Sequence, residues 1–166
     1  FENLKSVFRL PTRNGSELLK QLLGKDVFDK PKPHNFVKRF IYYLTSHSDI
    51  ILDFFAGSGT TAQAVMELNE ADGGNRRYIC VQLPEKTEEQ SEAAKAGYAT
   101  IADITAARIK KVIEKIEAAR AQKTDLLNEN KPLPKLGFRK FTLAPSNFKL
   151  WRGDVIETEA DLVRQM

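Results

Sequence analysis

Residues 50–61 read IILDFFAGSGTT, and this segment predicts more of the architecture than any other part of the sequence. Its first five residues form an apolar run that carries one acid, Asp53, which is typical of a buried strand in a parallel sheet. Gly57 and Gly59 follow in a short loop, where the lack of a Cβ atom permits a tight turn. Residues 60–68 have apolar side chains on one face and continue the chain as a helix. The segment therefore predicts a strand, a glycine-rich turn and a helix in direct succession.

A second strand is expected shortly after this helix. Residues 72–75 read DGGN, which indicates a turn, and residues 78–83 form another apolar run that ends before a proline. A strand, a helix and a strand within about 35 residues make one βαβ unit. Thr100 and Asp103 then have the spacing of a capping box at the start of the longest predicted helix. The apolar stripe of that helix comprises Ile101, Ile104, Ile109, Val112, Ile113 and Ile116. This order of elements favours an α/β fold with a mostly parallel sheet flanked by helices.

The residues before this unit predict two further helices and a stiff connection. Residues 13–15 read RNG and indicate a turn, after which Ser16 is a suitable N-cap for a short helix over 17–23, ended by Gly24. Residues 28–33 contain two prolines in three positions, which favour an extended backbone. A helix with one apolar face follows them, and that face comprises Phe36, Val37, Phe40, Ile41 and Leu44.

The C-terminal part predicts less regular structure. Residues 137–143 and 148–151 have the composition of two short strands, and a Pro-Ser-Asn sequence between them favours a hairpin. The last residues are charged and are expected to be only partly ordered. We expect a lead-in with a short helix over 1–27, one main half-domain over 28–151 and a charged tail over 152–166.

The composition excludes several classes of protein. The chain has 166 residues, of which 42% are hydrophobic and 29% charged, and its formal net charge is +4. One cysteine, Cys80, excludes a disulfide framework, and with only two histidines no metal site is expected. No apolar run approaches the roughly 20 residues of a membrane span, which favours a soluble, cytoplasmic protein without a membrane partner. Because the chain begins with Phe1 rather than methionine, we expect it to be cut from a longer protein.

The positive net charge is only a weak indication of a nucleic-acid partner. Basic residues gather in three loose groups along the chain, and acidic residues such as Glu114 are interleaved with the group from Arg108 to Lys115. Mixed charge on a helix is typical of a solvated face, so these basic side chains are predicted to lie on the surface.

The glycine-rich turn predicts a site for an anionic group. Gly57 and Gly59 let a ligand approach the backbone, and the helix that follows offers free N–H groups and the positive end of its dipole. Asp53 is placed to accept hydrogen bonds from an ammonium group. A phosphate-binding P-loop requires a lysine that is absent here. A dinucleotide site, in which Ala62 stands for the third glycine, and a site for S-adenosyl-L-methionine both remain open.

Several of these segments together resemble one family. Residues 53–61, DFFAGSGTT, closely resemble the cofactor-binding motif of amino-DNA methyltransferases. Residues 28–33, FDKPKP, resemble the Lys-Pro motif that precedes the glycine loop in the permuted β-class of these enzymes. Residues 75–85, and 137–141 with 146–151, are similar to the C-terminal part of methylase subunits of type III restriction-modification systems. The resemblance covers nearly the whole chain.

The resemblance implies S-adenosylmethionine-dependent methylation of the N6 atom of adenine in DNA, by a Rossmann-like methyltransferase fold that is incomplete in this chain. It implies that Gln82 bonds the ribose hydroxyls or the adenosine, and that Lys32 is a candidate for the methionine carboxylate. The cofactor-binding residues implied in this way are Lys32, Asp53, Phe54, Phe55, Ala56, Gly57, Ser58, Gly59, Thr60 and Gln82.

The family's catalytic motif, Asp-Pro-Pro-Tyr or a close variant, does not occur in the sequence. In the β-class order this motif precedes the Lys-Pro segment, so it is expected upstream of Phe1, and the chain alone is expected to be inactive. The implied partners of the full-length protein are double-stranded DNA, a restriction subunit and a second methylase subunit. Other hypotheses are a methyltransferase of RNA or a small molecule, a non-catalytic DNA- or partner-binding module, and a nicotinamide-dependent oxidoreductase.

Overall fold

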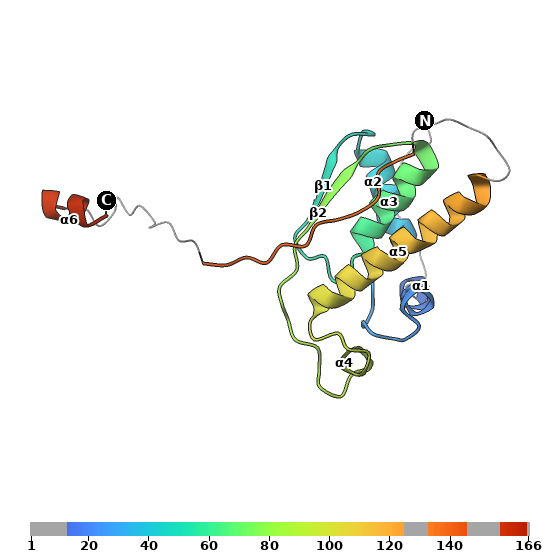
Figure 1. Ribbon diagram of the computed structural model, residues 1–166, viewed down its shortest axis with the longest axis horizontal. Coiled ribbons are helices and arrows are strands. Elements are labelled where there is room, and N and C mark those ends of the chain that lie inside the picture. The colour runs from blue at the N-terminus through green and yellow to red at the C-terminus, as the bar shows by residue number, and fades with distance from the viewer. Residues whose placement is uncertain (1–12, 125–132, 146–156, 166) are drawn as a thin grey trace.

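The computed structural model of the chain describes residues 13–124, 133–145 and 157–165. In Figure 1 the two strands lie side by side, and the helices α2, α3 and α5 lie together next to them. The elements in chain order are α1 (Arg13–Leu23), α2 (His34–Leu44), β1 (Ile50–Asp53), α3 (Thr60–Asp72), β2 (Arg77–Cys80), α4 (Glu92–Lys95), α5 (Ile101–Thr124) and α6 (Glu159–Gln165).

The predicted βαβ unit is present. β1 and β2 are parallel, with Ile50 opposite Arg77 and Asp53 opposite Cys80, and α3 connects them. Both strands are shorter than the sequence predicts. β1 ends at Asp53 because its carboxylate accepts a hydrogen bond from the backbone N–H of Phe55 at 3.0 Å, which turns the chain away from the strand direction.

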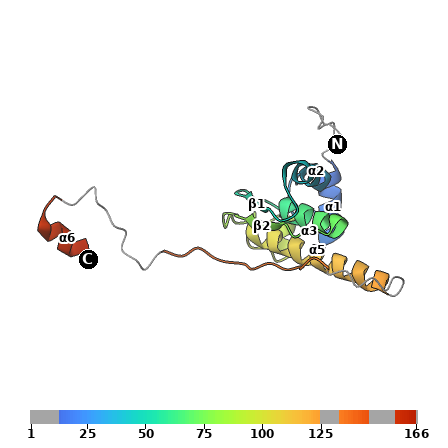
Figure 2. The same ribbon diagram turned by 90° about the horizontal axis from the view of Figure 1, so that it is seen from above.

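The expectation that both strands are buried is wrong for one face of the sheet. Ile51 and Tyr78 point to the helices and pack on the core, whereas Ile50, Leu52 and Ile79 are 51%, 48% and 51% exposed. Side chains alternate between the two faces of a strand. Among the described residues the helices cover only one face, so every second side chain of this small sheet is left in contact with solvent. Figure 2, seen from above, shows the strands at the margin of the helical layer.

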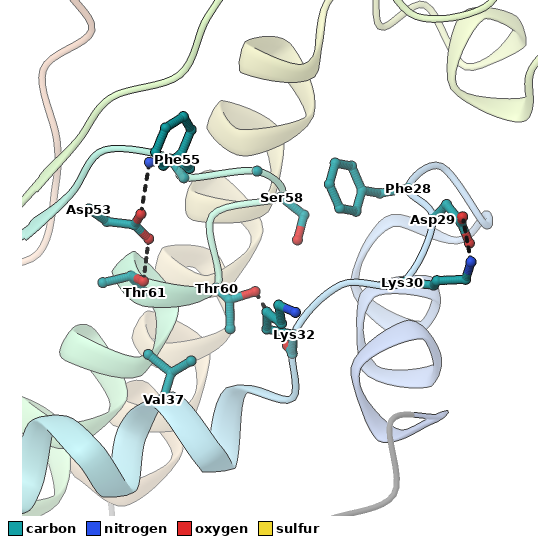
Figure 3. A pocket seen from close by; sticks show the side chains of 12 residues that line it. Phe28, Asp29, Lys30, Lys32, Val37, Asp53, Phe55, Ser58, Thr60 and Thr61 are labelled. Carbon is teal, nitrogen blue, oxygen red and sulfur yellow. Dashed lines mark hydrogen bonds and ion pairs between the residues drawn. The ribbon is translucent and has the colours of Figure 1, made fainter.

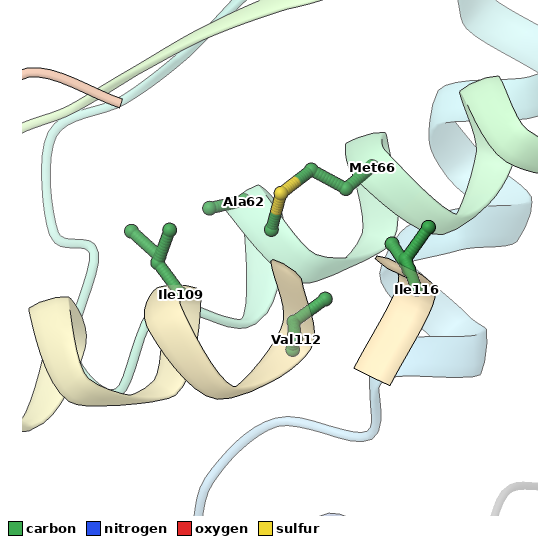
Figure 4. Packing of buried hydrophobic residues seen from close by; sticks show 5 residues of the cluster. All are labelled: Ala62, Met66, Ile109, Val112 and Ile116. Carbon is green, nitrogen blue, oxygen red and sulfur yellow. The ribbon is translucent and has the colours of Figure 1, made fainter. Parts of the chain in front are cut away.

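The main core lies between α3 and α5. The predicted stripe of α5 supplies three of its buried residues, Ile109, Val112 and Ile116. Ile104 is buried in a separate cluster with Val27 and Ala93, and Ile101 and Ile113 are only half-buried. The predicted capping box is formed, because the Asp103 N–H donates to Thr100 Oγ1 at 3.3 Å and the Thr100 N–H donates to Asp103 Oδ2 at 3.1 Å. Figure 4 shows the buried cluster of Ala62, Met66, Ile109, Val112 and Ile116.

α2 packs on the other side of α3 through one buried residue, Ile41, against Ala64, Val65 and Leu68. Leu44, predicted for the same apolar face, is 68% exposed. It lies at the last position of α2, before Thr45 continues in an extended conformation.

α1 begins earlier than the sequence predicts. Residues 13–15 are not a turn but the first residues of α1. Gly15 is buried, and a Cβ atom there would overlap the carbonyl oxygen of Pro31, so glycine serves close packing of the helix on the Lys-Pro segment. The predicted end is confirmed, because Gly24 is left-handed (φ +75°) and its N–H donates to Lys20 O at 2.7 Å.

The C-terminal strands are not confirmed. Residues 137–143 form no strand, and their predicted partner, 148–151, lies outside the described residues. Instead, Leu136 and Phe138 pack on the main core, and the carbonyl of Gly137 accepts a hydrogen bond from the Tyr78 hydroxyl at 3.2 Å. Part of the charged tail forms the short helix α6.

Candidate functional site

A pocket of about 310 Å³ lies at the carboxyl end of β1. Its walls come from two segments that are far apart in the sequence: the glycine loop, residues 54–59, and the Lys-Pro segment, residues 28–33 (Figure 3). Val37, Asp53, Thr60 and Thr61 complete the lining. Seven of the ten predicted site residues line it: Lys32, Asp53, Phe55, Ala56, Gly57, Ser58 and Thr60.

Asp53 stands at the start of the loop and orders it. Its two carboxylate oxygens accept hydrogen bonds from the Phe55 N–H at 3.0 Å and from Thr61 Oγ1 at 2.5 Å, as the dashed lines in Figure 3 show. A carboxylate offers about four lone-pair positions, so two remain for a cationic or N–H group in the pocket. Thr61, which the sequence did not single out, therefore orients the acid.

At its two glycines the glycine loop lies too close to neighbouring residues to leave room for a side chain. Gly57 has φ +52°, and a Cβ atom there would lie 3.3 Å from the ring of Phe28. Gly59 has φ +81° and would place a Cβ atom 3.2 Å from Thr105 Cγ2. Gly59 is the N-cap of α3, so the positive end of this 13-residue helix adjoins the pocket wall.

Gln82 supports the loop from the β2 side. Its Oε1 atom accepts a hydrogen bond from the Gly57 N–H at 2.8 Å, and its Nε2 group donates to Leu83 O at 3.2 Å. Gln82, Phe54 and Gly59, which were predicted as site residues, are not among the residues that line the pocket. The Phe54 side chain is instead 65% exposed.

The Lys-Pro segment forms the opposite wall. The Lys32 side chain is exposed at the rim, and its backbone carbonyl accepts a hydrogen bond from Thr60 Oγ1 at 3.4 Å. Lys30 has φ +48°, a left-handed conformation that is uncommon outside glycine. Its ion pair with Asp29 at 3.6 Å is almost fully exposed and so contributes little to stability.

Arg108 is the main residue of the site that the sequence analysis missed. It was predicted on a solvated face of α5, yet it is completely buried beneath the glycine loop. Its Nη1 group donates to Ser58 Oγ and Thr60 Oγ1, both at 2.8 Å, and its Nε group donates to Gln63 Oε1 at 2.8 Å. Its Nη2 group has no partner among the described residues. Burial lowers the pKa of Arg108 to about 10, so the guanidinium stays charged at neutral pH.

A polar network continues from Arg108 towards α2. Gln63 Nε2 donates to Glu67 Oε1 at 2.7 Å, and Glu67 Oε2 lies 3.4 Å from His34 Nε2 at the start of α2. Burial lowers the pKa of His34 below its usual value, more than Glu67 raises it. The network thus joins α5, α3 and the start of α2.

The structure gives no sign of a nucleophilic cysteine or a metal site among the residues that it describes. Burial and the charge of Asp53 raise the pKa of the Cys80 thiol to about 11, as expected for a core cysteine. Within the ranges that the structure describes, no three His, Cys, Asp or Glu side chains come together as metal ligands would. In the same ranges no helix has the length and apolar character required to cross a membrane.

The arrangement can hold a ligand with charges of both signs. The helix N-terminus and the Lys32 ammonium favour an anionic group, and Asp53 favours a cationic one. Phe28 and Phe55 give the same pocket two aromatic surfaces, and Phe55 is 85% exposed. Such a lining fits an amino-acid moiety joined to a flat ring.

Residues 1–95 match the DNA methylase family. The Type III restriction-modification enzyme StyLTI Mod subunit of Salmonella typhimurium is 44% identical over 106 residues, which are 64% of this chain and 16% of that protein. The EcoPI Mod subunit of Escherichia phage P1 is 41% identical over 114 residues, 67% of this chain and 18% of that protein. The Type II methyltransferase M.KpnI of Klebsiella pneumoniae is 34% identical over 116 residues, 70% of this chain and 28% of that protein. The chain spans less than a third of the length of each.

Proposed function

The chain belongs to the DNA methylase family, and from this premise we propose that it is the S-adenosyl-L-methionine-binding part of a site-specific adenine-N6 DNA methyltransferase. The Mod-subunit relatives support a place in a type III restriction-modification system. In this proposal residues 28–151 form the cofactor-binding half of a Rossmann-like domain in a cytoplasmic protein.

The observation that carries the proposal is the meeting of two motifs in one pocket. The glycine loop and the Lys-Pro segment are separated by α2 and β1, yet Lys32, Ser58 and Thr60 line the same space (Figure 3). Ligands of open α/β sheets bind beyond the carboxyl ends of the strands, which is where this pocket lies.

The residues present fit S-adenosylmethionine. Its α-carboxylate suits the N-terminus of α3 and the Lys32 ammonium, and its ammonium suits the free lone pairs of Asp53. The adenine ring suits contact with the exposed face of Phe55. A phosphate ligand fits less well, because Asp53 faces the same pocket and would repel a second negative charge.

When bound, this group supplies an electrophilic methyl group on sulfur. The work of the chain is to orient the donor: Asp53 and the helix N-terminus hold the amino-acid end, so the sulfonium keeps one position relative to the acceptor. Fixed geometry of this kind accelerates transfer by removing rotational and translational freedom.

The acceptor side of the reaction is proposed to lie elsewhere in a longer methylase. The sequence holds no Asp-Pro-Pro-Tyr string, and the relatives are several times longer than the matched region. In this proposal the rest of the protein binds double-stranded DNA and flips the adenine out of the stack. It also pairs with a second methylase subunit and with a restriction subunit.

Calorimetric titration of the chain with S-adenosylmethionine, S-adenosylhomocysteine and NAD tests the proposal. We expect both sulfur ligands to bind and NAD not to bind. Asp53→Asn removes the charge with little change of shape and is expected to weaken binding at least tenfold, about 1.4 kcal/mol.

Thr61→Val is the matched control, because it removes a hydrogen bond to Asp53 but keeps the charge. It is expected to weaken binding less than threefold. Failure of a folded chain to bind either sulfur ligand, or equal loss in the two variants, would contradict the proposal.

A further inference from the structure

Arg108 lies where the two walls of the pocket meet, although it does not line the pocket itself. It is wholly buried, and its Nη1 group reaches Ser58 of the glycine loop and Thr60 at the start of α3. Thr60 in turn contacts the carbonyl of Lys32 in the Lys-Pro segment at 3.4 Å. The Arg108 guanidinium therefore contacts the glycine loop directly and the Lys-Pro segment through the Thr60 hydroxyl.

The direction of these hydrogen bonds is fixed by chemistry. A guanidinium can only donate, so the Thr60 hydroxyl must accept from Arg108. Its single proton is then free for the Lys32 carbonyl, which can only accept. A charged donor strengthens each link of such a chain because it polarises the next one.

A second branch reaches the start of α2, directly after the Lys-Pro segment. Arg108 Nε donates to Gln63, Gln63 donates to Glu67, and Glu67 lies against His34, two residues after Lys32. Gln63 is 1% exposed, so the part of this branch next to Arg108 is shielded from water. Both branches begin at Arg108; the first ends at Lys32 and the second at His34, which directly follows the Lys-Pro segment.

We propose that Arg108 is a positioning residue that holds the glycine loop and the Lys-Pro segment in one fixed arrangement, and thereby sets the affinity for the methyl donor. The affinity part rests on the proposed function, whereas the positioning part does not. Arg108 acts through Ser58, Thr60 and Gln63 and makes no contact with the ligand.

Four variants of the full chain separate the contribution of the Arg108 donors from that of the Thr60 hydroxyl. Arg108→Met removes the donors but keeps the length of the side chain. Thr60→Val removes the hydroxyl that joins Arg108 to the Lys32 carbonyl, and Thr60→Ser restores it. Arg120→Met is the matched control, because Arg120 also joins α5 to α3, through Glu70 at 2.6 Å, but lies three turns farther along α5.

The first readout is hydrogen exchange of single backbone amides in the ligand-free chain, measured by NMR. The amides of Gly57 and Gly59, which bond Gln82 and the Ala56 carbonyl, report on the loop, and the amide of Val65 in the middle of α3 reports on global opening. Relative to Val65, we expect exchange of the two glycines to accelerate at least tenfold in Arg108→Met. In Arg120→Met the ratio is expected to change less than twofold.

The second readout is the dissociation constant for S-adenosylmethionine. We expect about a tenfold increase in Thr60→Val and a return to within twofold of wild type in Thr60→Ser, a rescue that a general loss of packing would not produce. Unchanged relative exchange in Arg108→Met overturns the positioning role. Equal affinity of Thr60→Val and wild type overturns the role in binding. If wild type binds no ligand, the proposed function fails, while the exchange data still decide the positioning role.

Discussion

Replacing Gly59 by alanine tests the account of the glycine loop more sharply than any other single change. Gly59 is left-handed (φ +81°), and a Cβ atom there would lie 3.2 Å from Thr105 Cγ2 and 3.3 Å from Thr105 O. Gly73 offers the matched comparison on the same helix. It is also left-handed (φ +70°) at the other end of α3, but a Cβ atom there would meet nothing within 4 Å.

The magnitudes follow from these two environments. A left-handed alanine costs roughly 1–2 kcal/mol, and the smaller entropy of the unfolded alanine chain offsets about 0.4–1 kcal/mol of it. Gly73→Ala is therefore expected to destabilise the chain by about 1 kcal/mol. Overpacking against Thr105 adds about 1–2 kcal/mol at Gly59, giving about 2–3 kcal/mol in all.

Urea unfolding followed by circular dichroism measures both variants. In a chain of this size each kcal/mol lowers the Tm by about 2–4 °C, so the two variants are also expected to separate in thermal scans. Thr105→Ser removes Cγ2 but keeps the hydroxyl that donates to Gly57 O at 2.5 Å. The double variant Gly59→Ala/Thr105→Ser is expected to recover about half of the added loss.

Equal destabilisation by Gly59→Ala and Gly73→Ala, within about 0.5 kcal/mol, would refute this reasoning, since that is the usual error of additivity. It would mean that α5 does not press on the loop as the structure has it. No recovery in the double variant would locate the steric conflict elsewhere than at Thr105 Cγ2.

Three further predictions follow from buried contacts. Gly15→Ala gains about 1 kcal/mol of helix propensity but overlaps the Pro31 carbonyl, so we expect a net loss of about 1–3 kcal/mol in urea unfolding, and a stabilised variant would contradict the packing. The pKa of the Cys80 thiol is raised to about 11, so we expect iodoacetamide to alkylate it at pH 8 at least tenfold more slowly in the folded chain than in urea. For the same reason the free energy of unfolding is expected to fall as the pH rises from about 9 to about 11. Equal alkylation rates by mass spectrometry would argue against burial of the thiol. The Asn69 side chain accepts from the buried Arg76 N–H at 3.1 Å and donates to the Arg76 carbonyl at 2.9 Å. Asn69→Leu leaves both backbone groups without these partners, so calorimetric scans are expected to show a loss of about 2–4 kcal/mol in the free energy of unfolding. An unchanged stability would count against this link.

The parts of the fold that depend on local signals could be predicted from the sequence. The βαβ unit follows from two apolar runs and a glycine turn, and the capping box places the start of α5 correctly, directly after Thr100. The start of α1 was missed, because Gly15 acts through Pro31, a contact between segments that no local pattern reveals. The half-exposed sheet face was missed for a similar reason, since an apolar run does not tell whether a second layer covers it.

The sequence pointed to the residues around the pocket but not to those that support it. The glycine turn with Asp53, and the resemblance to methyltransferase motifs, named seven residues that line the pocket, and their roles in binding stay predictions. Arg108 was assigned to the surface by averaging charge along α5. The signal was present, since Ile104, Arg108 and Val112 follow at four-residue spacing, which places the arginine on the buried stripe.

The roles given to Gln82 and Lys32 stay predictions. The Oε1 atom of Gln82 is engaged by the Gly57 N–H, which leaves one amide proton and one lone pair for a ribose. The Lys32 side chain is exposed at the pocket rim, within the same lining as the helix N-terminus. Their proposed contacts therefore need the bound ligand to test them.

NMR titration of the 15N-labelled chain with S-adenosylmethionine tests the central claim most directly, because it reports both binding and its location. The account predicts saturable shifts of the backbone amides of Lys32, Gly57, Ser58 and Thr60, with those of α4 unchanged. Saturable shifts confined to residues outside the glycine loop and the Lys-Pro segment, or no shifts in a folded sample at millimolar ligand, would contradict it.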